Sequence, residues 1–209
     1  MSKVLLINGS PHDNGCIGTA LAEMKKIFDT EKVDVEIIHI GNKPVRGCVA
    51  CNFCKKSGHC VFTDDLVNEV ATKFEAADGI VVASPVYFAS PNGTLISFLD
   101  RLFYSTSFSK HMKVGAAVVS CRRGGNSASF DVLNKYFTIS NMPIASSSYW
   151  NQIHGFTADD AKKDLEGLQT MRNLAKNMSF MIKAIADAKE KSGYPKIESG
   201  VFTSFPDGK

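Results

Sequence analysis

Long hydrophobic runs are missing from this 209-residue sequence. A bilayer-spanning helix needs about 20 apolar residues, whereas the first apolar run, residues 4–7, ends at Asn8 and is also too short for a signal peptide. We therefore expect a chain that is neither inserted into a membrane nor exported, and that resides in the cytoplasm.

An excess of charge is missing as well. The 24 Lys and Arg face 21 Asp and Glu, a net charge of +3, so neither a nucleic-acid nor a membrane partner is indicated.

Two nucleotide-binding signatures are also absent. Neither Gly-x-Gly-x-x-Gly nor the P-loop pattern ending in Gly-Lys-Ser/Thr occurs, which argues against a dinucleotide-type Rossmann site and against an NTPase. No Ser/His/Asp set and no pair of carboxylates offers a competing chemistry. With 44% apolar and 22% charged residues, the composition is that of an ordinary globular chain.

The alternation of hydrophobic patterns predicts the fold. Short β-branched runs alternate with segments that are apolar at i, i+3/i+4 and i+7, the pattern of βαβ units on a parallel sheet. We expect an α/β fold with a five-stranded parallel sheet in the order 2-1-3-4-5 and helices on both faces. The predicted strands are residues 3–8, 33–40, 79–84, 114–120 and 144–148, and a long last helix is predicted at about 159–191. Residues 1–191 would form the domain, with an insertion at 41–62 and a C-terminal tail at 192–209.

The segments after strands one, three and four should meet, because ligands of an open parallel sheet bind at the carboxyl ends where the strand order reverses. After strand one, residues 9–19 lead into a helix start where free backbone N–H groups and the helix dipole suit a phosphate. A plain turn at Asn14-Gly15 with Asp13 as helix cap is an alternative of equal weight.

The segments after strands three and four carry other chemistry. Tyr87 and Phe88 offer flat apolar surface to a planar ring system, with two core aromatics as the alternative. Arg122 and Arg123 stand next to glycines that allow a ligand to approach the backbone, although surface arginines are usually just solvated.

Four motifs together resemble the NADPH-dependent FMN reductase family of flavodoxin-like proteins, and the resemblance runs from Lys3 to about Gly155. It implies a flavodoxin-like fold with FMN, whose phosphate would lie in loop 10–19 and whose isoalloxazine would lie between loops 85–88 and 122–126. The motifs are Gly9-Ser10-Pro11, Ser84-Pro85-Val86-Tyr87, Phe98-Leu99-Asp100-Arg101 and Arg122-Arg123-Gly124-Gly125. The implied FMN-binding residues are Ser10, His12, Asn14, Gly15, Cys16, Thr19, Pro85, Val86, Tyr87, Phe88, Arg122, Gly124 and Gly125. Relatives often have Gly-Asn-Thr where this chain has Gly15-Cys16-Ile17, which leaves the phosphate to Thr19 or to backbone amides.

Four of the six cysteines, Cys48, Cys51, Cys54 and Cys60, fall within 13 residues. In a reducing compartment such a cluster indicates metal ligands or reactive thiols rather than disulfides. The even spacing of the first three favours an iron–sulfur cluster over zinc and resembles the compact motif of the iron–sulfur flavoproteins, a branch of the same family. A [4Fe–4S] cluster, four metal-free thiols and zinc are the three readings, in that order.

The resemblance implies an oxidoreductase in which NAD(P)H reduces FMN. The flavin would pass electrons to a small acceptor (a quinone, nitro or azo compound, free flavin or metal ion) or through the cluster to a ferredoxin-like protein. Arg122 or Arg123 would supply positive charge where negative charge gathers on the reduced ring. The alternative is a non-enzymatic electron carrier or redox sensor that never meets a nicotinamide.

Weaker expectations concern the remaining polar and aromatic residues. We expect Cys16 and Cys121 to pack as small apolar groups near the flavin. His154 could edge the flavin pocket, although a lone histidine near aromatics is more often structural. Asp64 and Asp65 are expected to cap a helix start. A homodimer or homotetramer is expected because loop 41–62, the Tyr149-Trp150 segment and the aromatic tail add exposed apolar surface.

Overall fold

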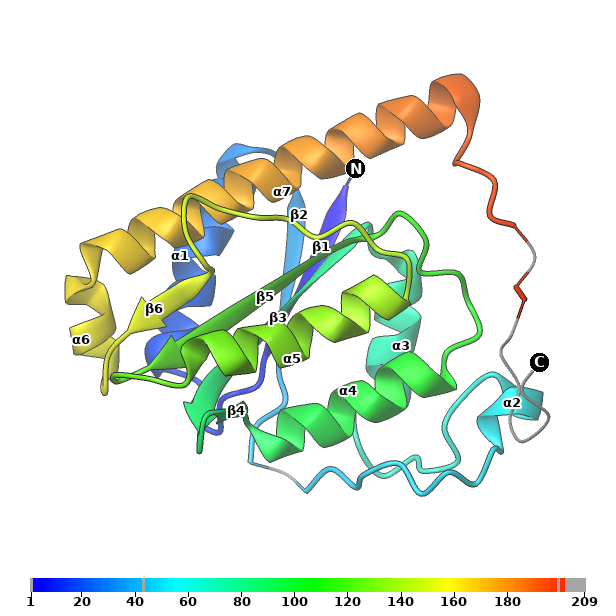
Figure 1. Cartoon of the computed structure of the whole chain (residues 1–209), viewed down its shortest axis with the longest axis horizontal. Helices are drawn as coiled ribbons and strands as arrows, with labels where there is room; N and C mark the ends of the chain where they lie inside the picture. The colour runs from blue at the N-terminus through cyan, green and yellow to red at the C-terminus, as the bar shows by residue number, and fades with distance from the viewer. Residues whose placement is uncertain (1, 43, 199, 202–209) are drawn as a thin grey trace.

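The computed structural model describes residues 2–42, 44–198 and 200–201 and arranges them around a mainly parallel sheet (Figure 1). The strands run in the order β2-β1-β3-β5-β6, and a short β4 pairs antiparallel with β3. The strands are β1 (Lys3–Asn8), β2 (Asp34–His39), β3 (Gly79–Tyr87), β4 (Ser90–Pro91), β5 (Val114–Cys121) and β6 (Gln152–His154). The helices are α1 (Cys16–Thr30), α2 (Cys54–Ser57), α3 (Val67–Ala76), α4 (Gly93–Ser105), α5 (Asn126–Ile139), α6 (Ala158–Lys163) and α7 (Leu165–Ser192).

The parallel path confirms the predicted 2-1-3-4-5 order, with β4 as an extra strand. Its central strands β1, β3 and β5 are buried on both faces, which explains their nearly continuous apolar sequence. The sheet has a hydrophobic core on each face, and alternate residues of β1 point into the two cores. Val4 and Leu6 pack in one core, and Leu5 and Ile7 pack in the other. Helices α1, α6 and α7 cover the first face, and α3, α4 and α5 cover the second (Figure 1).

The predicted fifth strand at 144–148 is wrong. Ile144 makes only an isolated bridge to Gly115, and the fifth strand of the path is β6. The chain leaves the sheet because its serines bond to α7 instead: the Ser147 hydroxyl donates to Thr170 O at 2.6 Å, and Asn177 Nδ2 donates to Ser146 O at 2.8 Å.

The single long helix predicted at 159–191 is two helices, α6 and α7. The break falls at Asp164, whose φ of −76° and ψ of 80° are not helical. Its carboxylate caps α7 by accepting from the backbone N–H of Gly167 at 2.9 Å, and it also accepts from the N–H of His154 at 2.6 Å. The cap therefore fixes β6 to the start of α7.

The edge strand β2 is joined to its neighbours by charge. Glu36 accepts from Lys3 Nζ at 3.0 Å and from Lys73 Nζ at 2.8 Å, linking β2 to β1 and α3. Hydrogen bonds from Lys73 and Lys3 hold the pKa of Glu36 below its usual value.

Within the described residues, none of the helices combines the length and apolar character that crossing a bilayer requires. The C-terminal tail contains three aromatic residues. Tyr194 is partly exposed and lies against His111, whereas Phe202 and Phe205 lie outside the described residues.

Candidate functional site

Three loops meet at the carboxyl edge of the sheet, as the topology predicts. The loop after β1 joins β3 because Gly9 N–H donates to Ala83 O and Asn92 Nδ2 donates to Gly9 O, both at 2.8 Å. The loop after β5 touches the β3–β4 hairpin so closely that a Cβ at Gly125 would lie 2.7 Å from Ala89 Cα. The φ of Gly125 is +88°, which also favours glycine.

The first of these loops, residues 9–15, leaves the start of α1 open. Gly15 is the N-cap residue and provides no side-chain hydrogen bond, and the first turn contains no acidic residue. The alternative that Asp13 caps this helix is therefore wrong. The first N–H groups of a helix have no intrahelical partner, so this open end suits an anion.

Local hydrogen bonds hold loop 9–15 in place. Asn8 accepts from Ser10 N–H at 3.0 Å and donates to Asp13 O at 3.3 Å, while Ser10 Oγ accepts from His12 N–H at 3.1 Å. The Thr19 hydroxyl donates to Gly15 O at 3.0 Å within the first helical turn. Its hydroxyl hydrogen is thus used within the helix, and the backbone amides remain the more available phosphate donors.

The same loop lines an open cleft of about 860 Å³. His12 and Asn14 are exposed on one side, and His39 and Phe156 contribute to other walls. The Cys16 thiol does not pack as a purely apolar group, because it donates to Thr157 O at 3.1 Å beside this cleft.

Two residues that shape the loop beside the cleft, His39 and Gly18, were missed from the sequence. His39 Nε2 lies 2.7 Å from Ser10 O and so donates to it in the tautomer that carries its proton there. A Cβ at Gly18 would lie only 2.1 Å from Asp13 O, so glycine is required where the loop crosses the helix start. Gly18 stands three residues after the Asn14-Gly15 pair, a spacing that could have signalled this role.

The β3–β4 hairpin presents its aromatic side chains outward. Phe88 is fully exposed and Tyr87 is 43% exposed, so the alternative that both are core residues is wrong. Phe88 and Ala89 both have positive φ, 50° and 58°, as a tight two-residue hairpin requires. Non-glycine residues are rarely held in this conformation, and such strain concentrates at functional sites. Pro85 and Val86 are half-buried behind the tip.

After β5, Arg122, Arg123 and Gly124 are exposed, and Cys121 is buried. Burial raises the pKa of the Cys121 thiol, and the hydrogen bond from the Arg123 backbone lowers it only in part. The Cys121 Sγ lies 3.6 Å from Nδ1 of His154, which is half-buried at the end of β6. The structure thus places His154 against the same loop rather than away from it.

The four clustered cysteines line one cavity beside the C-terminal end of α4. Cys48 and Cys51 are exposed, Cys54 is half-buried and Cys60 is buried. The cysteine loop rests on Tyr104, whose hydroxyl donates to Asn52 Oδ1 at 3.1 Å.

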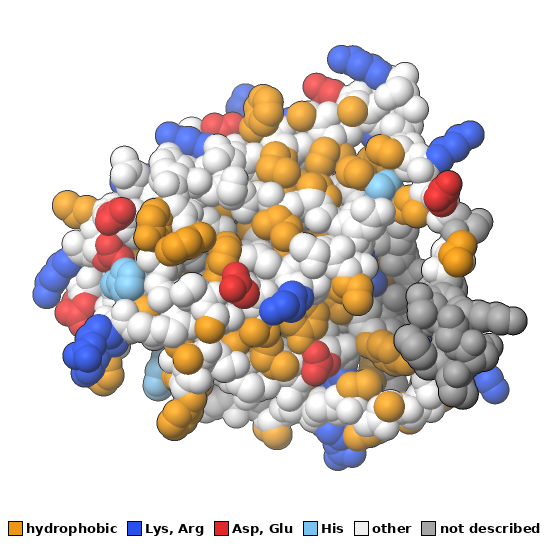
Figure 2. Space-filling model, viewed as in Figure 1, with side chains coloured by type: hydrophobic (Ala, Val, Ile, Leu, Met, Phe, Trp, Pro, Cys, Tyr) orange, Lys and Arg blue, Asp and Glu red, His pale blue; other side chains and the backbone are white. Residues whose placement is uncertain are grey.

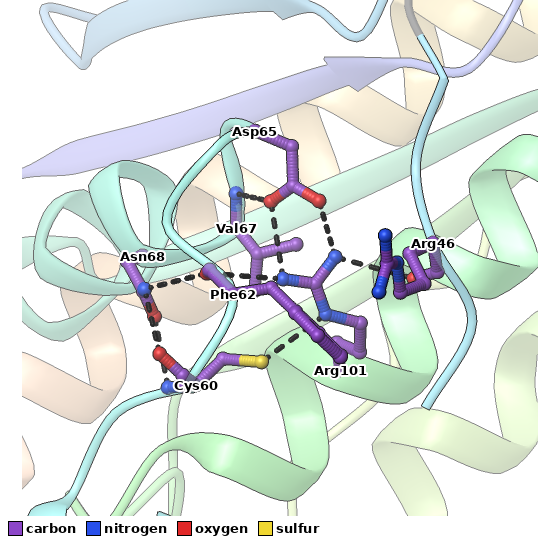
Figure 3. A network of polar contacts seen from close by, with 7 residues as sticks. All are labelled: Arg46, Cys60, Phe62, Asp65, Val67, Asn68 and Arg101. Carbon is purple, nitrogen blue, oxygen red and sulfur yellow. Dashed lines mark hydrogen bonds and ion pairs between the residues drawn. The ribbon is translucent and has the colours of Figure 1, made fainter. Parts of the chain in front are cut away.

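A buried polar network stands behind this cavity (Figure 3). Arg101, which is 1% exposed, forms an ion pair with both oxygens of Asp65 and donates to the carbonyls of Arg46 and Phe62, each at 3.2 Å. Its Nε donates to Cys60 Sγ at 3.2 Å. Burial lowers the pKa of Arg101, but hydrogen bonds to Asp65 and Cys60 outweigh it and raise the pKa above the usual value.

The expected cap role of Asp65 is met only in part: Leu66 is the N-cap residue of α3, but Asp65 Oδ1 accepts from the backbone N–H of Val67 at 3.1 Å. Asp64, by contrast, is exposed.

The four cysteines that line the cavity match the number of ligands that a [4Fe–4S] cluster takes. Among the described residues, no three His, Cys, Asp or Glu side chains converge on one metal position. A [4Fe–4S] cluster takes four Cys thiolates, one on each iron, and tolerates wider spacing. The Ser105 hydroxyl is buried in the cavity wall and has no hydrogen-bond partner in the part of the chain described, an orphan that a bound group would satisfy. The enclosed space is about 20 Å³, near the volume of one water, so the exposed loop would move outward around a cluster.

The β3–β4 hairpin and the cysteine loop with α2 lie at opposite ends of α4 (Figure 1). Asn92 caps its N-terminus beside the hairpin, accepting from Thr94 N–H at 2.8 Å, while Arg101, Tyr104 and Ser105 face the cysteine cavity at its other end. At 1.5 Å per residue, this 13-residue helix separates them by about 20 Å.

The strand order and the open loop after β1 define a flavodoxin-like protein, and comparisons with known proteins agree. A flavodoxin from the domain Archaea superposes with a TM-score of 0.57 at 15% identity, over 88% of this chain and 99% of that one. The structure of RosB, which contains a bound riboflavin-phosphate intermediate, superposes with a TM-score of 0.70 at 12% identity, over 99% of this chain and 93% of that one.

Sequence comparison specifies the family. The model of the NADPH-dependent FMN reductases matches residues 2–156, and an iron–sulfur flavoprotein of Methanocaldococcus jannaschii is 32% identical over 191 residues, 88% of this chain and 98% of its own length. The chain belongs to the NADPH-dependent FMN reductase family and is a flavin-dependent oxidoreductase.

Proposed function

We propose that the chain is an FMN-dependent oxidoreductase that takes electrons from NADH or NADPH and passes them to a small acceptor such as a quinone, a nitro or azo compound, free flavin or a metal ion. The observation that carries the proposal is that the loop before the open start of α1 is hydrogen-bonded through Gly9 to β3, the strand that ends in the strained aromatic hairpin. This arrangement offers an anion site next to a flat apolar surface, the two features that a flavin phosphate and ring need.

The residues around this edge have separable tasks. Backbone amides at the start of α1, with Ser10 and Thr19 nearby, hold the phosphate. Tyr87 and Phe88 provide the surface on which the ring lies, and Gly125 allows the backbone to approach it. When bound, FMN supplies the two-electron and one-electron transfer chemistry.

Arg122 and Arg123 supply positive charge to the ring. A guanidinium held near the ring favours the more negative, reduced state. Removing a hydrogen bond to a charged group costs about 1.5–3 kcal/mol, which for a two-electron couple is about 30–60 mV. Arg122→Gln or Arg123→Gln should therefore lower the flavin potential by about this amount in a redox titration, and no change in either variant would contradict the role.

The four cysteines, we propose further, hold a [4Fe–4S] cluster that gives the flavin an exit to a ferredoxin-like protein. The support is the cavity lined by all four thiols and the iron–sulfur flavoprotein at 32% identity. Free thiols of this kind suit a reducing cytoplasm. The same cavity favours the second candidate function, a carrier that exchanges single electrons with proteins and does not use a nicotinamide.

A homodimer or homotetramer remains part of the proposal. Tyr149 and Trp150 are both about half exposed, and Figure 2 shows further hydrophobic side chains spread over α5 and between α5 and α7. Because about 20 Å separates the two sites within one chain, a second copy packed near the exposed cysteine loop would shorten the electron path. Light scattering that gives the mass of one chain, 22.7 kDa, would contradict this assembly.

Anaerobic spectroscopy of freshly isolated protein, with FMN, iron and sulfide analysis, tests both cofactors. Mixing with NADH or NADPH in a stopped-flow instrument then separates the two functions. Rapid bleaching of the flavin by either nucleotide supports the oxidoreductase, whereas a flavin that neither nucleotide reduces would support the carrier. A protein that binds no FMN would refute both.

A further inference from the structure

Arg101 uses all five of its N–H donors, and four of them go to oxygen. The two terminal nitrogens bond to Asp65, Phe62 O and Arg46 O, which leaves Nε for the Cys60 sulfur. This arrangement fixes the guanidinium plane and aims one donor at the cavity. A neutral thiol is a weak acceptor, so a buried cation is paired there with a poor partner. A thiolate bound to iron carries negative charge and makes the same contact a charge-assisted hydrogen bond.

Ser105 gives a second, independent observation on the same helix face. It follows Arg101 by four residues, the spacing at which helix side chains stand side by side. Ser105 is one of the residues that line the cysteine cavity, and its buried hydroxyl has no hydrogen-bond partner among the residues that the structure describes. A buried hydroxyl without a partner carries an energetic cost, which a sulfur acceptor in the cavity would remove.

We propose that Arg101 and Ser105 donate hydrogen bonds to the sulfur atoms of the iron–sulfur group held by the four cysteines, and thereby raise its reduction potential. This inference rests on the proposed function. The reduced group carries one more negative charge than the oxidised group, so donors aimed at its sulfur atoms stabilise the reduced state more. Asp65 is a positioning residue in this arrangement, because it orients the guanidinium and touches no sulfur.

The test compares Ser105→Ala and Arg101→Lys with the wild-type chain after anaerobic loading with iron and sulfide. Ser105→Ala removes only an unpaired hydroxyl, and Arg101→Lys keeps the charge but loses the Nε donor. Ser179→Ala is the matched control: this serine is equally buried, on α7, and its hydroxyl donates to Ala175 O at 2.8 Å away from the cavity.

The readouts are iron and sulfide content, and the midpoint potential from a redox titration followed by electron paramagnetic resonance. We expect wild-type iron content in Ser105→Ala and a reduced-to-oxidised ratio at fixed potential that falls about two- to tenfold in each cavity variant, the effect of one hydrogen bond. A tenfold fall corresponds to about 59 mV for one electron. The flavin potential should not change in either variant, because the length of α4, about 20 Å, separates the proposed flavin site from the cysteine cavity.

The outcomes separate this inference from the proposed function. Loaded variants whose potentials equal that of wild type overturn the inference and leave the cluster in place. Wild-type protein that takes up no iron or sulfide overturns the proposed cluster and the inference with it. If Arg101→Lys fails to fold, Ser105→Ala alone decides, because loss of an unpaired hydroxyl does not disturb the apoprotein.

Discussion

The Arg101–Asp65 pair makes a quantitative prediction about stability. Both side chains are nearly inaccessible, 1% and 6% exposed, so Asp65→Asn leaves a guanidinium buried without its counter-charge. Removing one partner of a buried pair costs about 3–5 kcal/mol. We expect the lower end, about 3 kcal/mol, because the asparagine oxygen can still accept one hydrogen bond. Asp64→Asn is the matched control, since Asp64 is exposed, and it should change stability by less than about 0.5 kcal/mol.

Urea denaturation of the cofactor-free protein measures this difference. The midpoint should fall in Asp65→Asn while the slope stays at the wild-type value, which marks a loss of stability rather than a change in the unfolded state. Adding Arg101→Met to Asp65→Asn should recover part of the loss, because a buried pair can be replaced by apolar groups at little cost. Equal midpoints for Asp65→Asn and Asp64→Asn would refute the assigned buried pair.

Three further predictions concern other parts of the chain. Gly125→Ala should weaken FMN binding, measured by fluorescence quenching, because the new Cβ would push the hairpin away. A Cβ at Gly93 would meet nothing within 4 Å, so Gly93→Ala should bind FMN as wild type does; equal affinities of the two variants would contradict the contact. Glu36→Gln should be less stable than wild type at pH 7, and this difference in stability should disappear between about pH 5 and pH 3. The pKa of Glu36 is lower in the folded chain than in the unfolded chain, so its carboxylate stabilises the fold at a pH above the unfolded-state pKa, and this contribution is lost as the pH falls through the folded-state pKa. A difference that stays constant in acid would exclude this linkage. Cys121 should react with iodoacetamide at pH 8 more slowly in the folded chain than in urea, because its thiol is buried and has a raised pKa. Peptide mass spectrometry measures both rates, and equal rates would contradict the assigned burial.

The sequence predicts the central sheet well for a physical reason. Strands β1, β3 and β5 are covered on both faces, so burial imposes apolar runs that can be read without tertiary information. The fifth strand differs, because β6 has three residues and only Ile153 of them is buried. A strand with one buried residue has no recognisable alternation of apolar and polar residues, so the pattern favours the neighbouring run 144–148 as the fifth strand instead.

The candidate site divides in the same way. Helix starts and glycine-rich turns are local, so loops 9–19, 84–93 and 121–126 were predicted as a set. The contacts of His39 with Ser10 and of Asn92 with Gly9 depend on which segments the fold brings together, and no local pattern encodes them. Asp65 has both kinds of role. Its cap bond to Val67 is local, but its pairing with Arg101 spans 36 residues and leaves no periodic trace.

Helix α4 is the element that connects the two halves of this chemistry. At its start, Asn92 accepts from Thr94 N–H and donates to Gly9 O, so the helix is fixed to the loop proposed to hold the phosphate. At its end, Arg101 and Ser105 face the cysteine cavity. A helix with intact backbone hydrogen bonds transmits displacement along its axis better than a loop does, because packed elements shift as units. The contacts of Asn92 and Arg101 therefore make α4 the structural link between the loop after β1 and the cysteine cavity.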